Sequence, residues 1–262
     1  MPVPFVDRHP TPEELERLRL VLSTYQDGSG MLKVGSITLP GWRDFERSTA
    51  VTFDGIAQES KAIFDVLIPN PDVANVNFGV SCKMRREFER IVRTGRASLE
   101  LSNSAGKFWT ELGKLGLNLT NYKTKPKEVG AALLGLIHRW HEEVDLSRGG
   151  LVDVGRSFYL SLMWSLRGNY QLHQFSLELP DPSTLTWSFP SRGDTAGKLL
   201  RGADASGSVI EWYGESGGQL KYYPLVTDAI WESPIFQLEP LAQGEYGVLT
   251  KARSYFGDKW PR

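Results

Sequence analysis

The residues whose types and spacing could do chemistry lie within residues 63–84 of this 262-residue chain. Two apolar runs separated by a Pro- and Asn-rich turn predict a β-hairpin there. Asp65 interrupts the first strand, while Ser81 and Lys83 alternate along the second and point to one face. A carboxylate in a buried strand is costly unless it binds or pairs with a cation. An acid and a lysine on the two strands of one hairpin can build a divalent-metal site for phosphodiester hydrolysis.

Such a site would hold its metal through oxygen atoms. We expect Mg²⁺, for which Mn²⁺ can substitute, to bind the carboxylate of Asp65, the backbone carbonyl of Cys82 and water. The metal would polarise the phosphate and lower the pKa of an attacking water. Lys83 would orient or activate that water and stabilise the growing negative charge. Glu100 alternates with Leu99 and Leu101 on a predicted strand, so it is expected on the same polar face.

Two other readings of these residues remain open. A literal Pro-Asp pair, Pro71–Asp72, lies in the predicted turn and makes Asp72 the alternative to Asp65 as the functional acid, although turns favour these residue types for backbone reasons alone. Asp65 could also be a purely structural partner of Lys83, because a Ser-X-Lys triplet is common.

The elements that must position these residues are predicted from helix and strand signals. Thr11 followed by Pro12 is a good helix start. The predicted secondary structure changes after Gly149, from mostly helical to mostly extended. Before this glycine the sequence predicts helices over 12–25, 42–53, 85–94, 104–115 and 126–144, and strands near 56–60 and over 97–102. After it, strand-like runs dominate, over 157–164, 170–179, 209–213 and 219–223.

This order of elements, with the residues it carries, resembles the restriction-endonuclease-like superfamily that has the PD-(D/E)XK signature. The superfamily core is a helix, three strands, a helix and a strand, which matches residues 42–102. Ser81 follows Asp65 by 16 residues, within the range that the superfamily allows. The sequence segments 79–85 and 100–109 also resemble segments of bacterial restriction enzymes of this type. The resemblance implies that Asp65 is the metal-binding acid and Lys83 the motif lysine.

Ser81 departs from the pattern, because the family usually has Asp or Glu at this position. The resemblance implies that a neighbouring element supplies the missing carboxylate. The candidates are Glu59, Glu46 and Glu100, with Glu100 ranked last.

Basic residues after the hairpin are candidates for DNA contacts. Arg86, Arg90 and Arg93 share one face of the predicted helix, and Arg85 precedes them. They could contact phosphates, or they could form a solvated face paired with neighbouring glutamates. Lys107 and the basic segment of Arg192, Lys198 and Arg201 are further candidates for DNA binding.

Two histidines have a helix-compatible spacing for a metal. His138 and His141 lie with Glu142 on the helix predicted over 126–144. No Cys or further His partner is evident nearby, whereas a structural Zn²⁺ site needs four ligands. We interpret this segment as a surface helix.

Composition sets only broad limits. The formal net charge of −1 does not indicate nucleic-acid binding, so any such binding needs a local basic patch. The single cysteine, Cys82, fits a reducing compartment. The N-terminal residues lack the apolar run of a signal peptide, and no apolar stretch approaches the ~20 residues of a membrane span. We expect a cytoplasmic protein without a membrane partner.

These inferences combine into one hypothesis. The fold class is α/β, with a restriction-endonuclease-like core of a mixed sheet flanked by helices in residues 1–149. A β-rich C-terminal elaboration, 150–262, is packed on it for DNA recognition, dimerisation or both. The expected function is that of a Mg²⁺-dependent type II restriction endonuclease, a homodimer that cleaves double-stranded DNA at a short sequence without a nucleotide cofactor. The alternatives are an inactive DNA-binding module on the same fold and a structure-specific repair nuclease.

Overall fold

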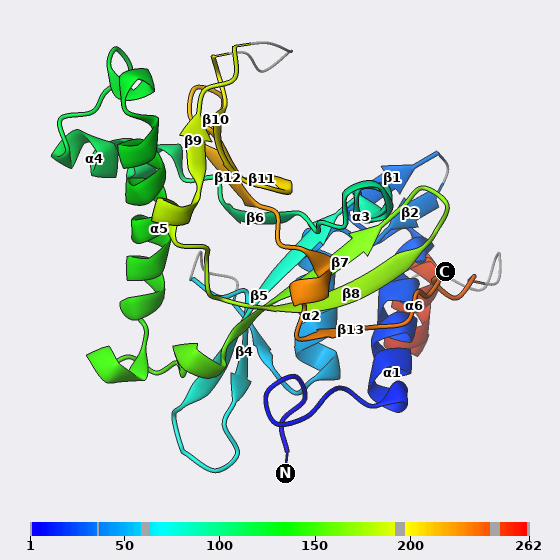
Figure 1. The fold of residues 1–262 in the computed structure, drawn as a ribbon. Coiled ribbons are helices and arrows are strands. Elements are labelled where there is room, and N and C mark those ends of the chain that lie inside the picture. Colours follow the sequence, from blue (N-terminus) through cyan, green and yellow to red (C-terminus); the bar gives the residue numbers. More distant parts are fainter. Residues whose placement is uncertain (1, 36, 59–62, 192–196, 242–246, 261–262) are drawn as a thin grey trace.

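The computed structural model describes residues 2–35, 37–58, 63–191, 197–241 and 247–260 (Figure 1). Its described part is a mixed α/β structure, with two large sheets flanked by helices, which confirms the α/β class. Within this part, no helix is both long and apolar enough to cross a membrane.

The first sheet contains the hairpin predicted from the sequence. Six strands belong to it within the described residues, in the order β13-β8-β7-β5-β4-β3. They are β3 (Ile56–Ala57), β4 (Val66–Pro69), β5 (Asn77–Arg85), β7 (Phe158–Trp164), β8 (Tyr170–Ser176) and β13 (Trp231–Glu232). β5 and β7 run parallel, and every other neighbouring pair is antiparallel. The sheet is therefore mixed.

One face of the first sheet is covered by two N-terminal helices, α1 (Pro12–Ser23) and α2 (Trp42–Thr52). Phe78, Val80 and Cys82 of β5 are buried there in one cluster with Phe45 of α2 and Leu18 of α1. Because side chains alternate along a strand, the intervening residues of β5 point to the opposite face. The start of α1 is the predicted one, since the side chain of Thr11 caps the helix in a capping box.

The second sheet is antiparallel and has the order β6-β12-β11-β10-β9. Its strands are β6 (Leu99–Ser102), β9 (Thr186–Ser188), β10 (Leu200–Asp204), β11 (Gly207–Tyr213) and β12 (Gln219–Tyr222). The helices α4 (Ala105–Lys114) and α5 (Pro126–Glu142) pack on one face of it (Figure 1). Trp212 and Trp187 of the sheet are buried with Phe108 and Leu133 of these helices.

The remaining elements are short. A hairpin of β1 (Leu32–Val34) and β2 (Ile37–Leu39) lies between α1 and α2 in the chain. The helix α3 (Phe88–Thr94) follows β5, which extends to Arg85, so this helix starts later than predicted. The helix α6 (Val248–Phe256) lies near the C-terminus.

The structure corrects the predicted place of strand 97–102. This segment was expected to join the hairpin sheet, but β6 pairs with β12 in the second sheet. The strand beside β5 is β7, and a parallel neighbour needs a long crossover, which α3, β6, α4 and α5 provide. β7 and β8 lie after residue 150, whereas β6, α4 and α5 lie before it. The predicted boundary at 149/150 therefore does not separate the two sheets.

The close contact between Gly79 of β5 and the ring of Phe64 predicts a stability effect. A Cβ atom at Gly79 would lie 2.4 Å from this ring, so Gly79→Ala should lower the free energy of unfolding by about 1–3 kcal/mol. Thermal denaturation measures it. Gly113→Ala is the control, because a Cβ at this exposed position in α4 meets nothing within 4 Å. Equal melting temperatures for the two variants would contradict the packing argument.

Candidate active site

The structure brings Asp65, Ser81 and Lys83 together. Lys83 Nζ lies 3.3 Å from Asp65 Oδ2, and the hydroxyl of Ser81 lies 3.5 Å from the same oxygen. The side chains of Lys83 and Asp65 are 16% and 26% exposed, so the pair is partly desolvated but reachable from solvent. The three side chains thus share one face of the first sheet, as the alternation in the sequence predicts.

The register of the hairpin explains this meeting. Val66 of β4 is the partner of Val80, and the backbone N–H of Asp65 donates to the carbonyl of Val80. Asp65 therefore lies beside Ser81, and Lys83 reaches it from two residues further along β5. Val80 and Cys82 point to the other face, toward α2.

Cys82 is placed to offer its backbone and not its thiol. The thiol is buried among the apolar side chains, and burial raises its pKa well above the usual value, with the charges of Asp65 and Glu46 adding to the effect. Backbone groups two residues apart in a strand point the same way. The carbonyl of Cys82 therefore points to the same side as that of Val80, toward the edge where Asp65 lies.

The expected auxiliary acids lie in different places. Glu46 lies on α2, on the helix side of β5 near Cys82. Glu100 lies on β6 in the second sheet, where Arg85 and Gln219 donate hydrogen bonds to its carboxylate. Its expected position on a shared sheet face is thus wrong, because β6 pairs with another sheet. Glu59 lies outside the described residues.

The alternative acid, Asp72, lies far along the hairpin from Lys83. It is exposed in the turn between β4 and β5, and its backbone N–H donates to the side chain of Asn70. The turn lies between the paired residues Pro69 and Asn77, at the opposite end of β4 from Asp65. Of the two acids, Asp65 thus lies beside Lys83, and Asp72 lies in a turn, where its residue type is favoured.

The donor atoms at this site suit a hard cation with few protein ligands. No group of three or more His, Cys, Asp or Glu that could hold a metal occurs within the described parts of the chain. Asp65 supplies one carboxylate, and the hydroxyl of Ser81 and the carbonyl of Cys82 are further oxygens. Mg²⁺ characteristically keeps several waters and binds through one or two carboxylates and substrate phosphates. The residues present fit such a site.

The polar face continues across the sheet from Lys83. Lys83 is in register with Ser161 of β7, and Ser161 with His173 of β8. Both are fully buried, and their side chains have no hydrogen-bond partner within the described residues. Burial lowers the pKa of His173 to about 4. The carboxylate of Glu232 lies 3.6 Å away but is 57% exposed, so burial outweighs its attraction. The polar positions in these apolar strands were a signal that the sequence analysis missed.

A second histidine approaches the site from helix α5. His141 is only 8% exposed, and its ring stacks on Phe64 with a centroid distance of 5.7 Å. The interpretation of this segment as a surface helix is wrong for His141. It is right for His138, whose side chain is 74% exposed and lies 3.2 Å from Glu142.

The predicted DNA-binding residues are spread over both sheets. Arg90 lies 3.9 Å from the ring centroid of Tyr223, and Lys221 is near Arg85 and Arg90, whose charges add to the effect of burial in lowering its pKa. Three of the predicted residues are exposed: Arg86, Arg93 and Lys198. Lys107 lies over the ring of Trp140, and Arg201 forms a salt bridge with Glu211. Arg192 lies outside the described residues. A local group of cations thus forms where α3 meets the second sheet.

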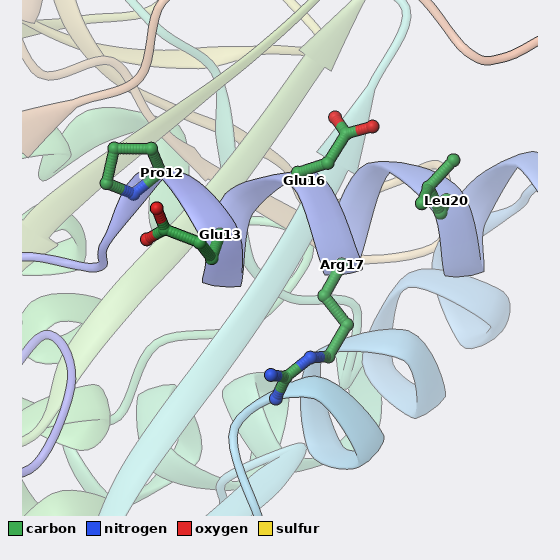
Figure 2. Close-up of a pocket in the computed structure, with 5 residues that line it drawn as sticks. All are labelled: Pro12, Glu13, Glu16, Arg17 and Leu20. Atoms are coloured by element: carbon green, nitrogen blue, oxygen red, sulfur yellow. The ribbon is translucent and has the colours of Figure 1, made fainter.

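The hollow drawn in Figure 2 is separate from this site. It is lined by residues of α1 alone, Pro12, Glu13, Glu16, Arg17 and Leu20. Because α1 packs on the face of the sheet opposite to Lys83, this hollow cannot contribute to the site around Asp65.

No family model, no curated protein and no solved structure matches the chain.

Burial of the neutral His173 predicts a loss of stability in acid. Its pKa is lowered from 6.5 to about 4, so between these values the unfolded chain binds a proton that the folded chain does not. Stability therefore falls as the pH drops, by about 2 kcal/mol between pH 7 and pH 5 for this residue. Urea denaturation of His173→Phe should show a smaller loss than the wild type. An unchanged loss would contradict this account, and His138→Phe is the exposed control.

Proposed function

We propose that this protein is a Mg²⁺-dependent endonuclease that hydrolyses phosphodiester bonds of double-stranded DNA, as a type II restriction endonuclease does. The observation that carries the proposal is the meeting of Lys83 Nζ and Asp65 Oδ2 at 3.3 Å on one sheet face, beside the hydroxyl of Ser81. A purely structural salt bridge needs only the first two groups. The additional oxygen donors beside them favour a site for a cation and a phosphate.

The order of elements also supports the proposal. A helix, α2, precedes three antiparallel strands, β3, β4 and β5, and a helical crossover leads to the parallel strand β7. This order supports the resemblance to a core of a helix, three strands, a helix and a strand, with β7 in the place first given to residues 97–102. The resemblance also implies a homodimer on a palindromic site, since a two-fold axis would present one active site to each strand.

The roles of the residues follow from their positions. Asp65 and the carbonyl of Cys82 would hold the metal, which supplies Lewis-acid polarisation of the phosphate. Lys83 would exchange its contact with Asp65 for one with the attacking water or a phosphate oxygen. Ser81 would contribute a neutral oxygen, so the site carries one negative charge fewer than a site with two carboxylates.

Replacement of Lys83 should separate cleavage from binding. Lys83→Ala removes the ammonium that orients the water and should lower the cleavage rate by about 10²–10⁴-fold. Binding should change little, because the other candidate cations would still contact the DNA backbone. Cleavage is followed on unmodified phage DNA with Mg²⁺, and binding by gel shift with Ca²⁺. Lys114→Ala on α4 is the control, since this exposed residue pairs with Glu111. Wild-type turnover by Lys83→Ala would refute the proposed site.

Replacement of Ser81 tests the missing carboxylate. Ser81→Asp adds a second hard anionic ligand, so the Mg²⁺ concentration for half-maximal cleavage should fall several-fold relative to the wild type. Ser81→Ala is the matched control and should shift this concentration upward. An unchanged requirement for Mg²⁺ in both variants would place the metal elsewhere.

The serine also favours a second candidate function, an inactive DNA-binding module. Such a protein would shift DNA but never nick it with Mg²⁺ or Mn²⁺. A restriction endonuclease gives discrete fragments from phage DNA, whereas a structure-specific repair nuclease requires branched or damaged substrates. One gel with these substrates separates the three.

A further inference from the structure

His141 is the titratable residue of α5 that lies next to the face of Asp65 and Lys83. Its ring is nearly parallel to that of Phe64, with an interplanar angle of 10°, and lies 6.3 Å from the ring of Tyr159. Phe64 precedes Asp65 in the chain, and Tyr159 is the register partner of Ser81. The imidazole is therefore held against the immediate neighbours of two site residues.

His141 lies close enough to Lys83 for the charge of this lysine to affect its pKa. Burial, followed by the charges of His138 and Lys83, lowers the pKa of His141 to about 4. The ring is thus neutral near pH 7, with one N–H donor and one acceptor nitrogen. Neither nitrogen has a hydrogen bond within the described part of the chain.

The nitrogens of His141 are not among the fully buried side-chain atoms that lack a partner, so they reach solvent at the edge of the ring. They are therefore available to a ligand. The small exposed fraction of His141, 8%, leaves an edge for a ligand to meet. His138, on the preceding turn of α5, differs in each respect, because it is exposed and paired with Glu142.

We propose that His141 is a further catalytic residue, whose neutral imidazole N–H donates a hydrogen bond to a non-bridging oxygen of the phosphate bound at Asp65 and Lys83. This inference rests on the proposed phosphodiesterase function. Asp65 would hold the phosphate through the bound cation from the strand side, and His141 would contact it from the helix side. A hydrogen bond to an ionised oxygen is stronger than one between neutral groups.

The substitution His141→Phe tests the inference without removing the stacked ring. Under single-turnover conditions with saturating DNA and Mg²⁺, the cleavage rate should fall about 10–100-fold, the size expected for one hydrogen bond to a charged group. DNA binding with Ca²⁺ should fall less than the cleavage rate, because other groups also hold the DNA, and the melting temperature should not fall. His138→Phe makes the same change on the preceding turn and should cleave at the wild-type rate. A rate for His141→Phe within twofold of the wild type would overturn the inference.

A second readout separates this inference from the proposed function. The chain has four histidines, and Mn²⁺ bound at Asp65 should broaden the ring proton signals of His141 in NMR spectra before those of His9, which stacks on Trp231. Asp65→Asn should abolish this selective broadening. If the wild type cleaves no DNA but the broadening is present, the nuclease function fails and the place of His141 at a metal site stands. If the wild type cleaves DNA and neither readout involves His141, the inference fails alone.

Discussion

The two-sided character of β5 is the constraint on which the rest of the structure depends. On one side, Phe78, Val80 and Cys82 are buried against the helices α1 and α2. On the other side, Ser81 and Lys83 meet Asp65, which directly precedes β4. A shift of one residue in the register would exchange the two faces, bury an ammonium under a helix and expose the apolar set. The hydrophobic packing of the helices therefore also fixes the position of the polar site.

The face of the first sheet that carries Lys83 holds polar side chains among buried apolar ones. Ser161 and His173 continue the row of polar side chains from Lys83. His141 of α5 lies beside Phe64, which precedes Asp65 in the chain. Burial keeps both histidines neutral near pH 7, so the charges here are those of Asp65 and Lys83. Interactions between these charges and a ligand are stronger than in water, because the local dielectric constant is lower. Such a setting is suited to holding a metal and a phosphate.

The two sheets are connected at the same end of β5. Arg85, two residues beyond Lys83 and on the same face, donates to Glu100 of the second sheet, which also accepts from Gln219. Arg90 and Lys221 lie close to this contact. The cations that could hold a DNA backbone thus lie next to the proposed site and not on a separate domain. In the proposed nuclease, this arrangement would bring DNA binding and hydrolysis together.

The sequence by itself determined the local features: the capped start of α1, the hairpin of β4 and β5, and the common face of Asp65, Ser81 and Lys83. These depend on residue types and on periods of two or four residues, which neighbours along the chain set. Only the tertiary structure decided that β6 leaves the hairpin sheet, that β7 becomes the parallel neighbour of β5, and that Glu100 meets Arg85. It alone also decided that His141 is buried beside Phe64 while His138 is exposed. Strand partners and helix faces are chosen by contacts between segments far apart in the chain, and no local period specifies those contacts.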